Sequence, residues 1–160
     1  MDSDGANEKK LIEGTDIGGY AYAPDWSPDG SKIIFFNYLN PFNKVNQVWV
    51  MDSDGSNRKM LYDWGFSPVW SPDRRKIAFT GNRDAWKAWQ SADIYVMNAD
   101  GSDVKILTDV GPSWDDDPDW SPDGTKIVFC SNLHNPTEQF EIYVMDADGQ
   151  NVQRLTNTPV

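Results

Sequence analysis

The most unusual group of chemically active residues is a run of three carboxylates, Asp115-Asp116-Asp117, which directly follows Trp114. Adjacent carboxylates raise one another's pKa unless a cation or a hydrogen-bond donor lies nearby, so such a run suits a basic peptide or a hard metal ion such as Ca²⁺. We predict a binding role for all four residues without a bound metal. A solvated acidic loop is the simpler alternative.

Catalytic chemistry has little support in the sequence. His134 is the only histidine, and a Ser-His-Asp triad would need it beside a positioned serine, whereas no nucleophile-elbow motif is present. Phosphate-binding glycine loops and zinc-ligand spacings are also absent. We therefore predict a protein that is not an enzyme and has no cofactor, with His134 on its surface among the candidate binding residues.

Aromatic residues are frequent between the apolar runs, where loops are expected. Aromatic rings with a polar edge are favoured contact residues at protein interfaces. They also pack loops onto a scaffold, which is the simpler explanation for any one of them. The candidate binding set from these segments, with one basic residue beside the aromatics, is Tyr38, Arg83, Trp86 and Trp89.

The charge of the chain excludes two classes of partner. The 160 residues contain 25 Asp and Glu against 14 Lys and Arg, for a net charge of -11. This excess repels nucleic-acid phosphates and anionic membrane surfaces, and it favours a basic partner. No apolar run approaches the roughly 20 residues that span a bilayer. The single Cys130 allows no internal disulfide, and the cellular compartment stays open.

The elements that position these residues are internal repeats. The motif Trp-Ser-Pro-Asp begins at Trp26, Trp70 and Trp120, and each copy leads into Lys and an apolar run. A second apolar run follows in each copy and ends in an Asp-x-Asp-Gly block or a close variant. These blocks, counting one at the start of the chain, recur every 46–50 residues and begin at Asp2, Asp52, Asn98 and Asp146. Such a period is typical of stacked repeat architectures.

Each repeat predicts four short strands, which we call a to d. The apolar runs are rich in β-branched and aromatic residues and lack helical periodicity, while both Asp-containing blocks suit tight hairpin turns. Four antiparallel strands per repeat indicate a β-propeller blade. We predict an all-β chain with an extra strand d at 1–13, blade one at 20–63, blade two at 66–109 and blade three at 116–158. Trp26, Trp70 and Trp120 recur in phase and are predicted to be core.

The paired motifs Asp25-Trp26-Ser27-Pro28-Asp29-Gly30 and Val144-Met145-Asp146-Ala147-Asp148-Gly149 resemble the repeat of TolB-type β-propellers. The resemblance covers essentially the whole chain in three copies. It implies a six-bladed ring, and its functional implications are weaker because one fold hosts many activities. It suggests a periplasmic or extracellular location and an envelope protein bound at the channel mouth.

Three blades depart from this pattern, because propellers have four to eight. We expect closure by dimerisation into a six-bladed ring, with higher or open assemblies as the alternative. A d-like strand at 9–12 is then surplus, because 152–156 already completes blade three.

Blade topology places the irregular loops, including 109–119, on one face of the disc, where binding residues usually gather. We therefore expect a non-enzymatic module that binds a protein or peptide at this face or in the channel. Two alternatives stay open. One is a carbohydrate-active or hydrolytic propeller whose site forms across the oligomer, and the other is a propeller fragment with no function of its own.

Overall fold

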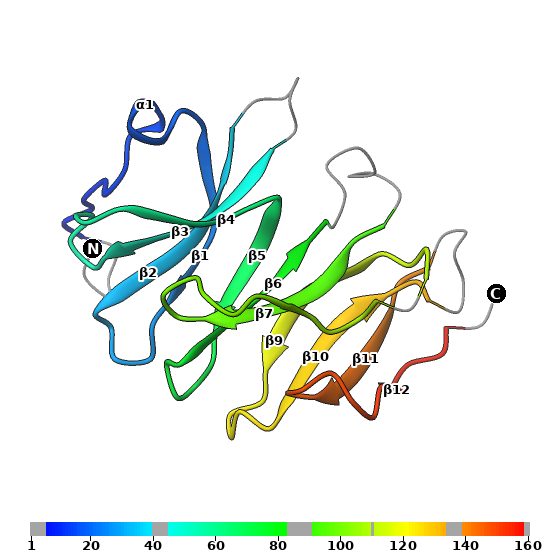
Figure 1. The fold of residues 1–160 in the computed structure, drawn as a ribbon. Helices are drawn as coiled ribbons and strands as arrows, with labels where there is room; N and C mark the ends of the chain where they lie inside the picture. Colours follow the sequence, from blue (N-terminus) through cyan, green and yellow to red (C-terminus); the bar gives the residue numbers. More distant parts are fainter. Residues whose placement is uncertain (1–5, 40–44, 83–90, 110, 134–138, 159–160) are drawn as a thin grey trace.

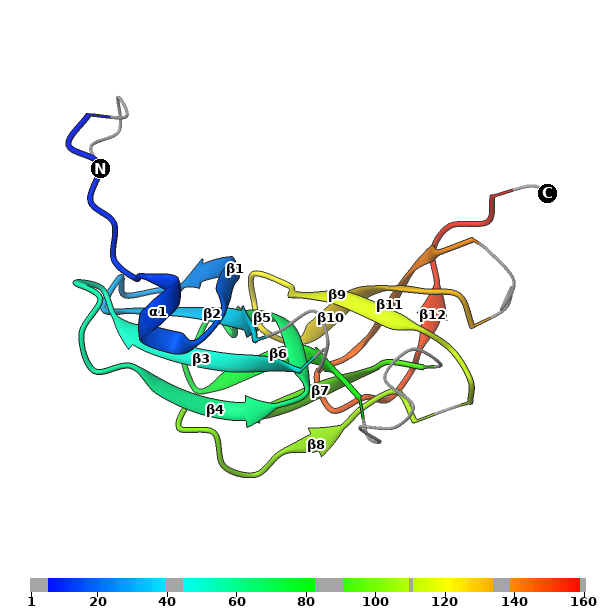
Figure 2. The same cartoon turned by 90° about the horizontal axis from the view of Figure 1, so that it is seen from above.

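The protein is built of three four-stranded antiparallel sheets, each made from one sequence repeat. The computed structural model describes residues 6–39, 45–82, 91–109, 111–133 and 139–158. The strands pair in chain order within each sheet, so each sheet is one propeller blade. The blades follow one another along an arc with the two ends of the chain at opposite sides (Figures 1 and 2). The predicted all-β architecture, with three four-stranded propeller blades, is confirmed.

The strand bounds follow the repeats. Blade one contains β1 (Tyr20–Trp26), β2 (Lys32–Tyr38), β3 (Asn46–Asp52) and β4 (Lys59–Asp63). Blade two contains β5 (Gly65–Trp70), β6 (Lys76–Gly81), β7 (Asp93–Asn98) and β8 (Lys105–Ile106). Blade three contains β9 (Asp115–Trp120), β10 (Lys126–Ser131), β11 (Glu141–Asp146) and β12 (Gln153–Arg154). The one helix of the described ranges is α1 (Gly14–Ile17), which agrees with the expected scarcity of helix.

The Trp-Ser-Pro-Asp motif builds the turn between the first two strands of each blade. In blade one the Ser27 hydroxyl donates to Asp29 Oδ1 at 2.7 Å and accepts the Lys32 N–H at 2.9 Å. Asp29 also accepts the Ser31 N–H, and these donors, Ser27 first, hold the pKa of Asp29 well below its usual value. The same bonds recur around Ser71 and Ser121, which explains the repetition of the motif.

The core lies between neighbouring blades. One cluster joins Ile34, Val48 and Val50 of blade one to a face of blade two that includes Trp70 and Phe79. A second cluster joins Ala78, Ile94 and Val96 of blade two to the matching face of blade three, and Trp120 packs against it. In both junctions the motif tryptophan of one blade therefore packs on the preceding blade.

Trp26 contradicts the prediction that all three motif tryptophans are core. Trp70 is 7% exposed and Trp120 is half-buried, whereas Trp26 is 55% exposed. The reason is positional: no blade packs on this side of blade one among the described residues. Ile33, Phe35 and Met51 on that face are instead covered by Leu11, Ile12 and Ile17 from the segment before β1.

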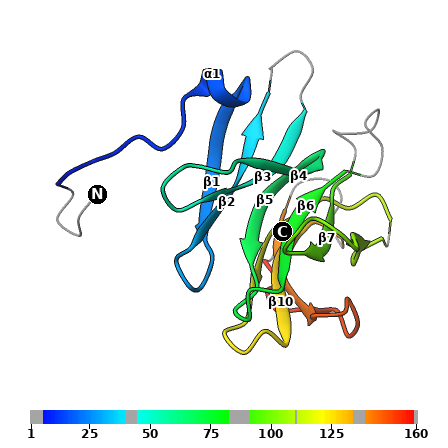
Figure 3. The same cartoon turned by 60° about the vertical axis from the view of Figure 1, so that its left-hand side comes forward.

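The segment at 9–12 also differs from its prediction as a strand. It has no regular secondary structure, although it lies against blade one on the side away from blade two (Figure 3). A d strand is formed by pairing with strand c of its own blade, and the described residues before it contain no such strand. The segment therefore keeps the contacts of a d strand with the next blade but not the ladder.

Gly65 lies at a close contact between blades one and two. A Cβ atom at this position would lie 2.8 Å from Val48 Cγ2 and 2.9 Å from Phe79 Cδ2. We expect Gly65→Ala to lower the free energy of unfolding by about 2–3 kcal/mol through overpacking, measured by urea denaturation. Gly30→Ala is the contrast, because a Cβ atom at this position would have no neighbouring atom within 4 Å. Gly30 has a φ of 69°, so the cost of this substitution is backbone strain of about 1 kcal/mol. Equal costs would contradict the packing argument.

The last strand of blade three is held by Glu141. Its carboxylate accepts hydrogen bonds from the Thr156 hydroxyl, from Thr158 N–H at 2.6 Å and from Arg154 Nη2 at 3.0 Å. The Thr156 bond is the largest of the effects that lower the pKa of Glu141 from 4.5 to about 2. The carboxylate thus fixes residues 154–158 to β11.

We expect Glu141→Gln to lower stability at pH 7, because an anion that accepts several hydrogen bonds is replaced by a neutral amide. A lowered pKa contributes stability above the unfolded value of 4.5, and this contribution disappears as the pH falls towards 2. The difference between the wild type and the variant in thermal unfolding should therefore be largest above pH 5 and shrink at pH 3. A difference that does not change with pH would contradict this role.

Candidate functional site

The first strand of every blade carries the same irregularity, and this irregularity shapes the inner edge of the arc. Ala23, Ser67 and Asp117 have φ values of 44°, 47° and 51°, and each precedes a proline. The pairing register shifts at the same place in all three strands, as in a β-bulge. Bulges redirect side chains and are frequent near binding sites. Because β1 contacts β5 and β5 contacts β9, the three bulges lie along one surface.

The acidic run belongs to β9 and not to the loop predicted over 109–119. Asp115 is buried, and its carboxylate accepts the Ser131 hydroxyl from the paired strand β10. Burial raises the pKa of Asp115, while the hydroxyls of Ser131 and Thr108 oppose the rise. The alternative of a solvated acidic loop is therefore wrong for this residue, which fastens the inner strand to its own blade.

Asp116 and Asp117 point to other partners. Asp116 accepts the Thr80 hydroxyl of blade two at 2.9 Å and the indole N–H of Trp114 at 3.4 Å. Its pKa is raised mainly by burial and then by the charge of Asp117. Asp117 is exposed and accepts the Ser67 hydroxyl at 2.9 Å. The three carboxylates are thus spread over three environments, and only Asp117 is exposed to a ligand.

A groove of about 350 Å³ runs over the three bulges. The groove is lined by three carboxylates, Asp25 from β1 and Asp117 and Asp119 from β9, whereas β5 between them contributes none. Each is fixed through one oxygen, because Asp25 accepts Trp70 N–H at 2.9 Å, Asp117 accepts Ser67, and Asp119 accepts Trp120 N–H at 2.8 Å. Three positioned carboxylates on an apolar floor, with Pro24, Pro68 and Pro118 between them, suit a cationic side chain.

The structure separates the other predicted binding residues. Tyr38 ends β2 in blade one, paired with Tyr20, while Trp114 precedes β9 with its backbone N–H donated to Asn132. Blade two lies between them, so they do not form one surface. Four further candidates, Arg83, Trp86, Trp89 and His134, fall outside the described residues. Asp25 and Asp119 were missed because each is a single carboxylate, although both directly precede a motif tryptophan.

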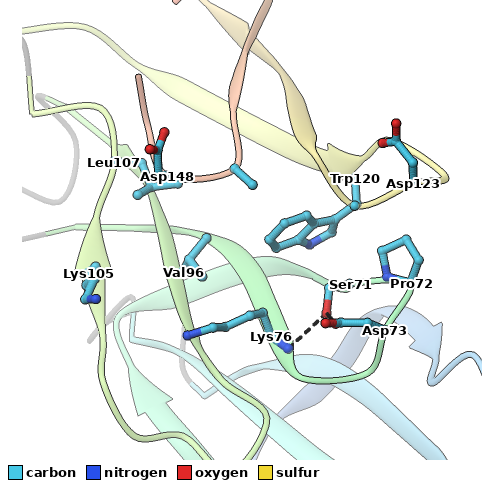
Figure 4. A pocket seen from close by; sticks show the side chains of 12 residues that line it. Ser71, Pro72, Asp73, Lys76, Val96, Lys105, Leu107, Trp120, Asp123 and Asp148 are labelled. Atoms are coloured by element: carbon cyan, nitrogen blue, oxygen red, sulfur yellow. Dashed lines mark hydrogen bonds between the residues drawn. The ribbon is translucent and has the colours of Figure 1, made fainter. Parts of the chain in front are cut away.

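A larger cavity of about 650 Å³ lies between blades two and three, beside the tight turns that join their strands. Figure 4 shows the Trp120 ring between Val96 and Pro72, with Lys76 and Lys105 on the side of blade two. The cavity was not predicted from the sequence. A sequence signal exists: Gly124 occupies the repeat position of Arg74, whose guanidinium bridges blades two and one through Asp29 at 2.6 Å.

The described residues contain no group of three or more His, Cys, Asp or Glu side chains that could hold a metal ion. Within the same ranges, no helix is long and apolar enough to cross a membrane.

Comparisons with known proteins agree on the architecture. The family model of the TolB beta propeller domain matches residues 1–159. A structure assigned as TolB from Agrobacterium tumefaciens is 28% identical, with a TM-score of 0.71 over 84% of this chain and 48% of that chain. TolB from Acinetobacter baumannii is 23% identical, with a TM-score of 0.73 over 97% of this chain and 36% of that chain.

An oligogalacturonate lyase from Vibrio parahaemolyticus is 18% identical, with a TM-score of 0.63 over 88% of this chain and 42% of that chain. Similarity at this level of identity shows the fold alone. No curated protein sequence matches the chain. The chain spans less than half the length of each of these three structures.

Proposed function

The chain belongs to the TolB β-propeller family, and from this premise we propose that it is a non-enzymatic binding module. Its groove over the inner strands holds a basic segment of a partner protein, and a second copy of the chain completes its ring.

The positioned carboxylates of the groove carry the binding proposal. Asp25, Asp117 and Asp119 are each oriented by a hydrogen bond before any ligand arrives, so little side-chain entropy is lost on binding. The net charge of -11 steers basic partners towards the protein at low ionic strength. A lysine or arginine side chain of a peptide fits both the charge and the size of the groove.

The binding proposal is tested with fluorescently labelled basic peptides of about ten residues, titrated at low and at physiological salt. For a peptide that binds, the double variant Asp117→Asn/Asp119→Asn should weaken the affinity by at least about tenfold at low salt. Asp148→Asn, in the turn between β11 and β12 and outside the groove, makes half of this charge change and should alter the affinity by less than about twofold. Equal losses in both variants would show general attraction by charge and would remove the groove as the site.

The geometry of the acidic run favours binding over catalysis. Asp115 is buried and accepts a hydrogen bond from the Ser131 hydroxyl, and Asp116 accepts one from the Thr80 hydroxyl of the neighbouring blade. Both carboxylates therefore stabilise the fold. A hydrolytic site across the oligomer would need these groups free to face the channel. Only Asp117 of the run lines the inner groove.

Self-association is supported by the exposed faces of the two end blades. Ile142 and Leu155 of blade three are 42% and 59% exposed, although their counterparts in blades one and two are packed against the next blade. Blade one exposes Trp26 on its opposite face. The two junctions inside the chain join these same faces, so the surface that fits blade three is blade one of a second copy.

Light scattering across a concentration series tests this assembly. A mass of about twice the 18.1 kDa chain is expected at high concentration. A well-folded protein that stays at the monomer mass throughout would reject closure by a second copy.

A further inference from the structure

The segment at 9–12 makes the same contact with blade one that the outer strands make with the following blades. A Cβ atom placed on Gly101 or Gly149 would lie 3.3 or 3.2 Å from the carbonyl oxygen of Leu61 or Leu107. At Gly55 the corresponding atom is the Leu11 carbonyl oxygen, at 2.6 Å. Leu11 therefore occupies, on blade one, the place of the strand-d leucine of a preceding blade.

Polar contacts show the same correspondence between the segment at 9–12 and the outer strand of a blade. Lys59 Nζ donates to the Asp100 carbonyl of the next blade at 2.9 Å, and Lys9 Nζ reaches the Asp54 carbonyl at 3.4 Å. In sequence, Lys9 and Lys59 each precede their leucine by two residues.

Leu155 is the next member of this series. It follows Gln153 at the same spacing, on the face of blade three against which no other blade packs among the described residues, and it is 59% exposed. If blade three of one copy packs on blade one of another, Leu155 reaches the position that Leu11 already fills. Both leucines cannot occupy it.

We propose that residues 9–12 are a displaceable stand-in for residues 153–156 of a second copy, and that this segment therefore limits self-association. The proposal rests on the assembly proposed above. Each junction between copies forms by exchanging Leu11 for Leu155, so the burial of one leucine side chain is offset by the exposure of the other. An intramolecular segment also competes at a high effective concentration.

The N-terminal segment yields because it is the more weakly held of the two. Residues 153–158 are tied to β11 through Glu141 and through the Leu155 N–H, which donates to the Ile142 carbonyl at 2.7 Å. Residues 9–12 have no strand ladder, and Arg58 holds the Leu11 carbonyl at 2.9 Å from an exposed position. This guanidinium can hold the Leu155 carbonyl equally well after the exchange.

The exchange ends at α1. Ile17 is buried, and its carbonyl accepts the side-chain amide of Asn37 at 2.7 Å, so the helix stays on blade one. The left-handed Gly18 and the extended Glu13 bound this anchor. The chain before Glu13 can therefore leave without disturbing β1.

Two matched leucine variants of the full chain test the proposal by sedimentation velocity across a concentration series. Leu11→Ala weakens the competitor, so self-association should tighten by about fivefold to tenfold. Leu155→Ala weakens the incoming strand, so self-association should weaken by a similar factor. Trypsin cleavage after Lys9 and Lys10 should also become faster in the assembled wild type, because these residues have been released.

The outcomes separate the two proposals. If the wild type associates and Leu11→Ala leaves the constant unchanged or weakens it, the segment is part of the interface and the exchange is wrong, while the assembly stands. If neither the wild type nor Leu11→Ala associates at any concentration, the assembly itself is wrong and the exchange falls with it. Urea denaturation of both variants confirms that each is folded.

Discussion

Trp70→Ala is expected to lower the free energy of unfolding by about 3–5 kcal/mol, whereas Trp26→Ala should lower it by less than about 1 kcal/mol. The two residues occupy the same position of the same motif. Trp70 is 7% exposed between blades one and two, so its removal leaves a cavity in the core between them. Trp26 is 55% exposed, and its removal changes a surface that is already hydrated.

Urea denaturation of the two variants, followed by far-UV circular dichroism at a concentration below self-association, measures both effects. Trp26→Ala should instead weaken self-association, because an adjoining blade three would bury that ring. Equal destabilisation by the two substitutions at low concentration would mean that Trp26 is already covered in the monomer. The description of blade one as an open end would then be wrong.

The contrast between these tryptophans defines what the sequence can predict. The fold followed from the repeats, because each copy contains its own turn chemistry and strand pattern, and those interactions are local. Whether a motif residue is buried depends on which blade lies beside it. The motif has the same sequence in every copy, so it does not indicate whether a neighbouring blade is present. The place of Trp26 in the blade was therefore predicted correctly, but its burial was predicted wrongly.

The assignment of the acidic run Asp115–Asp117 to a loop was wrong for a related reason. Aspartate disfavours strands, so Asp115–Asp117 indicated a loop, and tertiary hydrogen bonds to Ser131, Thr80 and Ser67 override that preference. Comparison of the repeats contains the missing signal. The first strand of each blade ends in the pattern x-Pro-x-Trp. Asp117-Pro118 therefore aligns with Ser67-Pro68, which belongs to a strand that was easier to recognise.

The inter-blade cavity follows the same logic. Gly30, Arg74 and Gly124 share one turn position, and all three have φ values between 65° and 70°. Only the arginine reaches the preceding blade, where it meets Asp29. The junction of blades two and three lacks that side chain, and its cavity of about 650 Å³ is larger than the cavity of about 360 Å³ that Arg74 lines between blades one and two.

Ile142→Asp is expected to abolish self-association, with a loss of more than about a hundredfold in the association constant, while the monomer stays folded. Ile142 is 42% exposed on the unpaired face of blade three, so in the monomer a carboxylate there keeps much of its hydration. On assembly the same charge would be buried against an apolar blade without a partner, at a cost of several kcal/mol. Sedimentation velocity measures the loss, and circular dichroism confirms the fold.

Ile94→Asp is the matched control, because Ile94 occupies the same strand position in blade two and is fully buried against blade three. This variant should be largely unfolded, since an unpaired buried charge costs an amount comparable with the whole stability of a small domain. If Ile142→Asp associates like the wild type, the copies meet through another surface. If it unfolds like Ile94→Asp, the face of blade three is already covered by its own chain, and the open-ended arc of three blades is incorrect.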